Sequence, residues 1–159
     1  MRRVRYLVVE SLYEADTSEH PAEDVYRRRI GEALESEPDV AGPGPSGFGM
    51  GALRGVVKRY VELDRYIQEG ATRYPVETMA VVDRNILRLA IWELLTDNSA
   101  PVAAVINEAV ELAHRYGGDS SPGFINGVLR TVSERIQAAK AANLALPEAL
   151  PPTPTSQEN

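Results

Sequence analysis

The chain has 159 residues, of which 43% are hydrophobic and 25% are charged, and it contains no cysteine. This composition is typical of an ordinary globular domain, and the lack of cysteine excludes disulfides, thiol nucleophiles and thiolate metal sites. Seventeen Lys and Arg residues against 23 Asp and Glu residues give a formal net charge of -6, which argues against broad, non-specific attachment to nucleic acid. Any contact with RNA or DNA must therefore be local.

The first sixteen residues predict an amphipathic helix, because Val4, Leu7 and Val8 recur at helical spacing. Glu10 and Glu14 interrupt this apolar start, so it does not match a signal peptide. No later stretch approaches the roughly 20 apolar residues that a membrane-spanning helix needs. We therefore expect a cytoplasmic protein. Residues 20–37 predict a second helix with a weaker apolar period.

Residues 40–52 are rich in glycine and proline and predict a loop. The stretch 42–47 formally satisfies G-x-G-x-x-G, which is the fingerprint of dinucleotide-binding proteins. That motif needs a preceding strand and free backbone N–H groups, whereas an acidic helical segment precedes it here and two prolines remove donors. The spacing therefore does not indicate a nucleotide cofactor.

The remainder predicts helices over 53–67, 84–95, 102–116 and 121–136, with a break at Pro75 and with Asp83 as an N-cap. The helix over 84–95 is apolar in nearly every direction, which is typical of the centre of a bundle. No segment has the alternating pattern of a strand. We predict an all-α fold of six or seven helices over residues 1–140, followed by a proline-rich and disordered tail over 141–159.

The sequence offers no arrangement that supports catalysis. The two histidines, His20 and His114, lie far apart without metal-ligand spacing, and there is neither a nucleophile elbow nor a phosphate-binding Walker loop. We expect no enzyme activity, no cofactor and no metal site.

Several features are suited to binding. Arg2, Arg3 and Arg5 concentrate positive charge at the start of an acidic chain, either to pair with phosphate oxygens or to aid solubility. The second cluster, residues 27–29, is expected to form ion pairs with nearby acids such as Glu23. Gly127 lies in a predicted helix at a cost of roughly 1 kcal/mol relative to alanine. Either close helix packing or contact with a ligand would account for it.

Three stretches, VVDRNILRLAIWELL, PVAAVINEAVELAHRYGG and SSPGFINGVL, resemble the NusB family of bacterial transcription antitermination factors. The resemblance covers about residues 2–136, and RRVRYLVVESLYEAD is similar to the family's arginine-rich opening. It implies a NusB-like bundle of two packed helical subdomains and a function without catalysis. The family pairs with NusE, a ribosomal protein of the small subunit, and the pair binds the boxA element of ribosomal RNA leader transcripts. RNA polymerase in this antitermination complex continues past terminators.

The resemblance also implies roles for individual residues. Those matching RNA-binding positions are Arg2, Arg3, Arg5 and Phe124, and those matching NusE-binding positions are Tyr13, Glu77 and Asp83. Structural roles are open for three of them, since Phe124 and Tyr13 fit a core as well and Asp83 fits a helix N-cap.

Other functions remain open. The same fold could serve as a ribosomal RNA assembly module or a protein-only adaptor. A helix-turn-helix DNA-binding protein is disfavoured, because the candidate recognition helix starting at Pro122 is poor in side chains that read bases. A homodimer formed over the first helix would mask the arginines until RNA or NusE binds.

Overall fold

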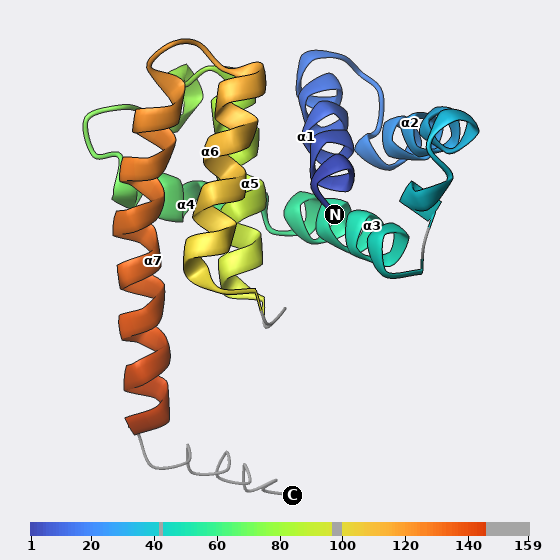
Figure 1. The fold of residues 1–159 in the computed structure, drawn as a ribbon. Helices are drawn as coiled ribbons and strands as arrows, with labels where there is room; N and C mark the ends of the chain where they lie inside the picture. The colour runs from blue at the N-terminus through green and yellow to red at the C-terminus, as the bar shows by residue number, and fades with distance from the viewer. Residues whose placement is uncertain (42, 97–99, 146–159) are drawn as a thin grey trace, which may run out of the picture.

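The computed structural model describes residues 1–41, 43–96 and 100–145, and over these residues the chain is helical without a strand. The helices, shown in Figure 1, are α1 Arg2–Thr17, α2 Ala22–Ser36, α3 Pro43–Lys58, α4 Tyr60–Gly70, α5 Val81–Leu95, α6 Val102–Tyr116 and α7 Ser121–Ala145. Two 3-10 turns, Pro38–Ala41 and Val76–Thr78, complete the elements. None of the helices in these ranges is both long and apolar enough to span a membrane. The prediction of an all-α fold is confirmed.

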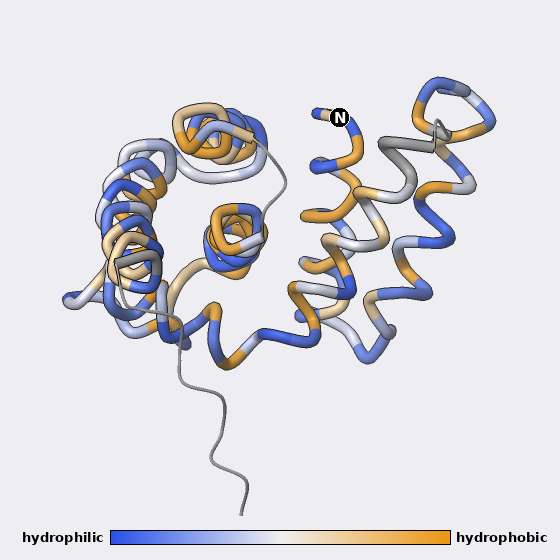
Figure 2. The backbone as a smooth tube through the Cα atoms, turned by 90° about the horizontal axis from the view of Figure 1, so that it is seen from below, coloured by the Kyte–Doolittle hydropathy of each residue, from blue (hydrophilic) through white to orange (hydrophobic). Residues whose placement is uncertain are grey.

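The helices form two packed groups. Helices α1, α2 and α3 contact one another on one side, and α4, α6 and α7 gather around α5 on the other (Figure 1). Seen from below in Figure 2, the two groups lie side by side. Because α5 also contacts α1 and α3, one continuous apolar core runs through both groups. This arrangement confirms the expected pair of subdomains.

Helix α5 has the central position that its apolar pattern predicts. Ile86, Leu87 and Ile91 are fully buried, and even the polar Asn85 and Glu93 have little contact with solvent. A helix that is apolar in nearly all directions needs neighbours all around it. Helix α5 has such neighbours, since it contacts α1, α3, α4, α6 and α7.

The prediction of a loop over residues 40–52 is wrong, since most of this segment is the first half of α3. Pro43 and Pro45 lie in the first turn, where a backbone N–H has no partner within the helix. A side chain at Gly49 would overlap the hydroxyl of Tyr26. The glycines that suggested a loop therefore include one that close packing between α2 and α3 requires.

Two boundaries also differ from the predictions. The expected single helix over 53–67 is interrupted at Arg59, which separates α3 from α4. The predicted domain end at residue 140 falls inside α7, which continues to Ala145. At that position the Nζ atom of Lys140 donates a hydrogen bond to the carbonyl oxygen of Leu94 at 3.2 Å. The rest of the expected tail, 146–159, lies outside the described residues.

A buried arginine joins the two subdomains. Arg88 of α5 donates to both carboxylate oxygens of Asp64 in α4, at 2.7 and 2.9 Å, and to Asp16 of α1 at 2.9 Å. Its guanidinium also lies 4.3 Å from the ring centroid of Tyr60. Removing either carboxylate would leave a buried charge short of a partner, so this cluster fixes how α1 meets the α4–α5 pair.

Candidate functional site

The arginine-rich start of α1 lies beside α6. Arg2 forms a forked ion pair with Glu108 of α6, with Nη2–Oε1 at 2.9 Å and Nε–Oε2 at 3.1 Å. The Arg2 side chain is still 56% exposed. The hydrogen bond from Arg2 is the main reason that the pKa of Glu108 lies below its ordinary value. Arg2 is therefore accessible but already paired.

The other two arginines differ in accessibility. Arg3 donates from Nε to Glu37 at 3.2 Å, and both side chains are well exposed. Arg5 pairs with Glu93 at 2.7 Å, with only 12% of its side chain and 2% of that of Glu93 exposed. Its guanidinium also lies over the ring of Phe48, 5.1 Å from the centroid. Arg5 is thus largely enclosed between α1, α3 and α5.

Side chains of α1 also meet the last turn of α6. Tyr6 and Tyr116 meet edge to face with ring centroids 5.8 Å apart, and Arg115 lies over both rings. The hydroxyl of Tyr116 donates to Glu10 at 2.5 Å. Burial, followed by this hydrogen bond, raises the pKa of Tyr116 to about 12. The contact therefore stays intact at neutral pH and ties the last turn of α6 to α1.

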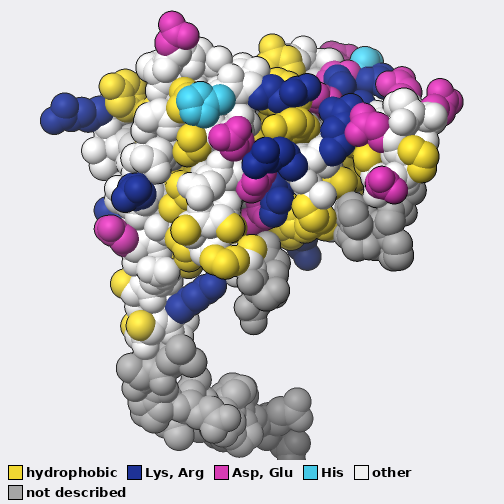
Figure 3. Space-filling model, in the orientation of Figure 1, with side chains coloured by type: hydrophobic (Ala, Val, Ile, Leu, Met, Phe, Trp, Pro, Cys, Tyr) yellow, Lys and Arg dark blue, Asp and Glu magenta, His cyan; other side chains and the backbone are white. Residues whose placement is uncertain are grey.

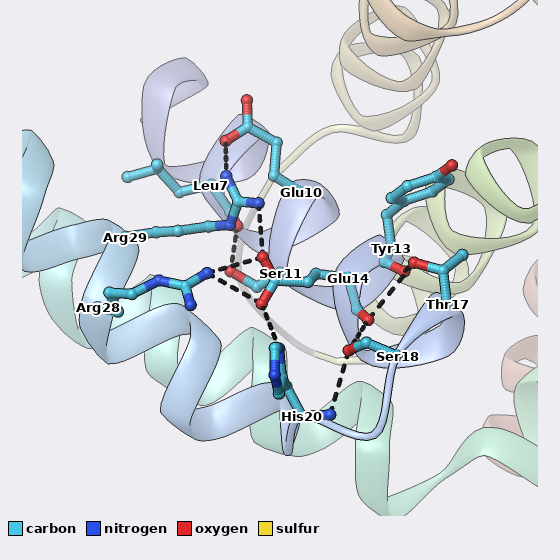
Figure 4. Close-up of polar contacts among 10 residues, drawn as sticks. All are labelled: Leu7, Glu10, Ser11, Tyr13, Glu14, Thr17, Ser18, His20, Arg28 and Arg29. Atoms are coloured by element: carbon cyan, nitrogen blue, oxygen red, sulfur yellow. Dashed lines mark hydrogen bonds and ion pairs between the residues drawn. The ribbon is translucent and has the colours of Figure 1, made fainter.

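The second arginine cluster is occupied by ion pairs, as predicted. Arg27 pairs with Glu23 at 2.6 Å, while Arg28 and Arg29 both reach Glu14 of α1, at 2.7 and 3.1 Å. Figure 4 shows these two guanidinium groups pointing toward the same carboxylate. Basic and acidic side chains are interspersed across the visible face in Figure 3. In that view acidic side chains lie among the basic ones.

Phe124 lies in the first turn of α7, after the turn that joins α6 to α7. Its ring meets that of Tyr74 edge to face, with centroids 5.5 Å apart and planes at 80°. Both rings line a hollow of about 290 Å³ together with Gly127. A side chain at Gly127 would have no atom within 4 Å, so close helix packing does not explain this glycine.

Tyr13 is exposed to 46% on α1, so it does not pack in the core. It lines a hollow of about 320 Å³ between the subdomains, together with Arg29 of α2, Val82 of α5 and Tyr116 of α6. The hollow therefore opens where the two groups of helices meet, directly beside the first turn of α5.

Asp83 follows Val82 in that first turn. It is not the N-cap, since that position is Ala80. Its residue exposure is 9%, and its Oδ1 atom has no hydrogen-bond partner within the described chain. Glu77 lies exposed in the 3-10 turn before α5, and no basic side chain of the described residues pairs with it. The carboxylate of Glu77 is thus accessible to a basic partner, whereas the unpartnered oxygen of Asp83 is buried.

The structure separates the predicted residues into distinct places. Arg2, Arg3 and Arg5 cluster at the start of α1, Phe124 lies in the first turn of α7, and Tyr13 lines the hollow beside the start of α5. The sequence-based predictions did not include Tyr74, the ring that meets Phe124. The available signal was an aromatic residue between a basic residue and a proline in the turn after α4.

Sequence comparisons agree with the resemblance. The NusB family model matches residues 2–134. The transcription antitermination protein NusB of Dehalococcoides mccartyi (strain CBDB1) is 44% identical over 135 residues, which are 85% of this chain and 90% of that protein. The NusB of Roseiflexus castenholzii is 42% identical, over 84% of this chain and 91% of that protein.

Structural comparisons give the same fold. NusB from T. maritima superposes with a TM-score of 0.72 at 28% identity, over 84% of this chain and 89% of that one. A crystal structure of the antitermination factors NusB and NusE in complex with dsRNA contains a chain with a TM-score of 0.71 at 22% identity, over 84% of this chain and 96% of that one. The helical architecture, the family match and these relatives together place the chain in the NusB family, whose named relatives here are transcription antitermination proteins and not enzymes.

Proposed function

We propose that this chain, together with NusE, binds boxA of ribosomal RNA leader transcripts and so takes part in the RNA polymerase antitermination complex. Membership of the NusB family supports this function. So does the existence of a related complex that contains NusB, NusE and dsRNA. The RNA in our proposal is a single-stranded boxA-type element.

The observation that carries the RNA-binding part is the exposed and exchangeable pairing of Arg2 and Arg3. Both guanidinium groups are held by carboxylates, Glu108 and Glu37, at the surface. A phosphate presents paired oxygens much as a carboxylate does, so it can replace these partners without leaving the arginines unpaired. Arg5 supports binding differently, because its enclosed pair with Glu93 holds the start of α1 in place.

The second RNA contact in this proposal is Phe124. Aromatic rings stack with unpaired bases at roughly 1–3 kcal/mol each, without strong preference for sequence. With a net charge of -6 and the arginines already paired, the chain alone attracts RNA weakly. A basic NusE would extend the positive surface and raise the affinity.

The NusE side of the proposal rests on Tyr13, Glu77 and Asp83. The Oδ1 atom of Asp83 is buried and lacks a partner, which carries a free-energy cost. In this proposal the first turn of α5 shifts when NusE binds, so that a donor from NusE reaches this atom and removes the cost. Asp83→Asn should therefore weaken NusE binding in calorimetry, whereas Asp24→Asn, at an exposed position on α2, should leave it unchanged. Equal affinities of both variants would contradict this assignment.

The RNA-binding test compares two double variants with the same loss of charge. Arg2→Ala/Arg3→Ala removes the proposed contacts, and Arg27→Ala/Arg135→Ala removes two similarly exposed, ion-paired arginines elsewhere. Fluorescence anisotropy would follow a labelled boxA RNA and a scrambled control, with and without NusE, at several salt concentrations. We expect selective binding that needs NusE, and a fall of the salt slope by roughly 1.4 in the first variant only, from two contacts at about 0.7 each.

A protein-only adaptor is the alternative that one observation favours, namely that all three N-terminal arginines have carboxylate partners. Under that function neither variant would change RNA binding, and no preference for boxA would be seen. NusE binding alone would then remain.

Self-association over α1 is a further part of the proposal. A homodimer formed there would cover Arg2 and Arg3 until RNA or NusE arrives. Sedimentation velocity should then show a dimer that dissociates when NusE is added. A chain that remains monomeric across the concentration range would rule this out.

A further inference from the structure

The hollow beside Phe124 has features that folding alone does not require. It has a volume of about 290 Å³ and lies between the turn after α4, residues 70–74, and the first two turns of α7, residues 123–128. Phe124 supplies one aromatic wall and Tyr74 the other.

Tyr74 is unusually accessible for an aromatic residue that takes part in a ring pair. It is 58% exposed, and the edge-to-face geometry at 80° leaves ring surface uncovered. Flat, exposed aromatic surface is what an unpaired nucleobase stacks on. Phe124 is partly buried and packs against the core, so it anchors the pair to α7.

The turn that carries Tyr74 is held rigidly by one side chain. Gln68 donates from Nε2 to the carbonyl oxygens of Ala71 and Tyr74, at 3.1 and 3.0 Å, and accepts from the backbone N–H of Val76 at 3.1 Å. The ring is thus positioned before any ligand binds, which lowers the entropic cost of binding.

The glycines around the hollow fall into two kinds. Gly70 is required by packing, since a side chain there would press on Val128 and Val132 of α7. Gly123 and Gly127 face open space, with no atom within 4 Å of where a side chain would begin. Glycine in a helix lowers its stability. Because packing does not require Gly127, its benefit is that it keeps the hollow open.

The charge beside the rings suits a nucleic acid. Arg73 is exposed, and none of the carboxylates in the described ranges forms an ion pair with it. In contrast, the N-terminal arginines each have a carboxylate partner. An unpaired guanidinium next to a stacking surface can bind the phosphate of the stacked nucleotide.

We propose that Tyr74 is a second base-stacking residue, which with Phe124 and Arg73 holds one unpaired nucleotide of the bound RNA in this hollow. This inference rests on the proposed function, because the ligand is the same RNA. The α4–α5 turn thereby becomes part of the RNA-binding surface.

The first experiment measures binding of boxA RNA to the chain–NusE complex by anisotropy. Tyr74→Ala should weaken binding about tenfold, as expected for the loss of one stacked base, and Tyr74→Phe should retain affinity. Val61→Ala is the matched control, since Val61 is a large apolar residue that is 77% exposed on α4 outside the hollow. Replacing the RNA bases one at a time with an abasic site should reveal one position at which Tyr74→Ala has no further effect.

The second experiment fills the hollow without removing a contact. Gly127→Leu adds a side chain to the open space that lines the hollow. It should weaken RNA binding about tenfold or more while the helical circular dichroism is unchanged. Gly31→Leu is the control, because Gly31 on α2 also faces open space but lies far from these rings in the chain.

The outcomes separate this inference from the proposed function. Selective RNA binding that is unchanged by Tyr74→Ala and Gly127→Leu would overturn the inference and leave the function in place. A loss of NusE binding in these variants in the absence of RNA would assign the hollow to protein contact and also overturn it. No selective RNA binding by the wild-type complex would overturn both.

Discussion

Two aromatic pairs in this molecule have similar composition and opposite surroundings. Phe48 meets Trp92 edge to face between α3 and α5, with ring centroids 6.2 Å apart. Arg5 lies over Phe48 and is neutralised by Glu93. The space that a side chain at Gly55 would take is filled by the indole ring of Trp92.

The pair formed by Tyr74 and Phe124 also has an arginine and a glycine beside it. Here the ring centroids are 5.5 Å apart, Arg73 is unpaired within the described chain, and Gly127 faces open space. In the first pair every group has its partner inside the protein. In the second pair the same kinds of group are left for a partner from outside.

The difference shows that residue type alone does not distinguish a structural cluster from a binding surface. At Phe48 and Trp92, the arginine is paired with a carboxylate and the space beside the glycine is filled by one of the two rings, so the set forms part of the protein's packing. At Tyr74 and Phe124, solvent lies where the carboxylate and the filling ring would be, so the same kinds of residue form a candidate binding surface. We call Phe48–Trp92 the closed pair and Tyr74–Phe124 the open pair. Substitutions at the closed pair should therefore change the stability of the protein, and substitutions at the open pair should change its binding.

The largest expected effect is at Arg5. Arg5→Ala leaves the Glu93 carboxylate, which is 2% exposed, without its main partner, and we expect the free energy of unfolding to fall by about 3–5 kcal/mol. Urea unfolding followed by circular dichroism measures this change. Arg73→Ala is the control at the open pair and should change it by less than about 0.5 kcal/mol. Similar losses in both variants would erase the contrast between the two pairs.

The next largest effect is expected at Gly55, the glycine whose side-chain space is occupied by Trp92. In Gly55→Ala the new methyl group overlaps the indole ring of Trp92, so either this ring or the contact between α3 and α5 must shift. We expect a loss of about 1–3 kcal/mol in the free energy of unfolding, which is typical of an overpacked core. The same urea titration gives the value, and a variant as stable as the wild type would mean that Trp92 moves aside freely.

At the open pair the same substitution should have the opposite sign. Gly127→Ala adds a methyl group in open space and improves helix propensity, so α7 should gain up to about 1 kcal/mol. Thermal unfolding of this variant next to Gly55→Ala tests the sign directly. A loss of stability at Gly127 would show that packing does depend on this glycine.

The smallest effect is expected at the exposed pair of Arg2 and Glu108. Glu108→Gln removes the carboxylate that competes with RNA phosphate, and exposed pairs contribute about 0.2–1 kcal/mol, so RNA affinity should rise by up to about fivefold. Glu69→Gln, which releases the exposed Arg135 instead, is the matched control in the anisotropy assay. An unchanged affinity after Glu108→Gln would mean that RNA does not replace this carboxylate.

The helices were predictable where the apolar pattern is strong. The pattern over 84–95 predicts a helix buried on all sides, and α5 has that position. The prediction was wrong over 40–52, because glycine and proline signal a loop only when no distant side chain demands their small size. Tyr26 makes that demand at Gly49. Such a requirement comes from another helix and is invisible in the local sequence.

The candidate site was predictable only in part. The cluster of Arg2, Arg3 and Arg5 is evident in the sequence, but their partners come from three separate segments that meet only after folding. Whether an arginine is exposed or enclosed depends on those partners. The sequence therefore located the basic end of α1 without separating the two accessible arginines from the enclosed one.

By itself, the sequence determined the all-helical fold, the central place of α5 and the NusB family, because each depends on a local period or on a long motif with kept spacing. The tertiary structure alone decided which charges are paired and at which glycines a neighbouring side chain occupies the space of a Cβ atom. Both depend on distances between residues that are remote in the chain. The pairing of Arg5 with Glu93 and the open space at Gly127 are the clearest cases.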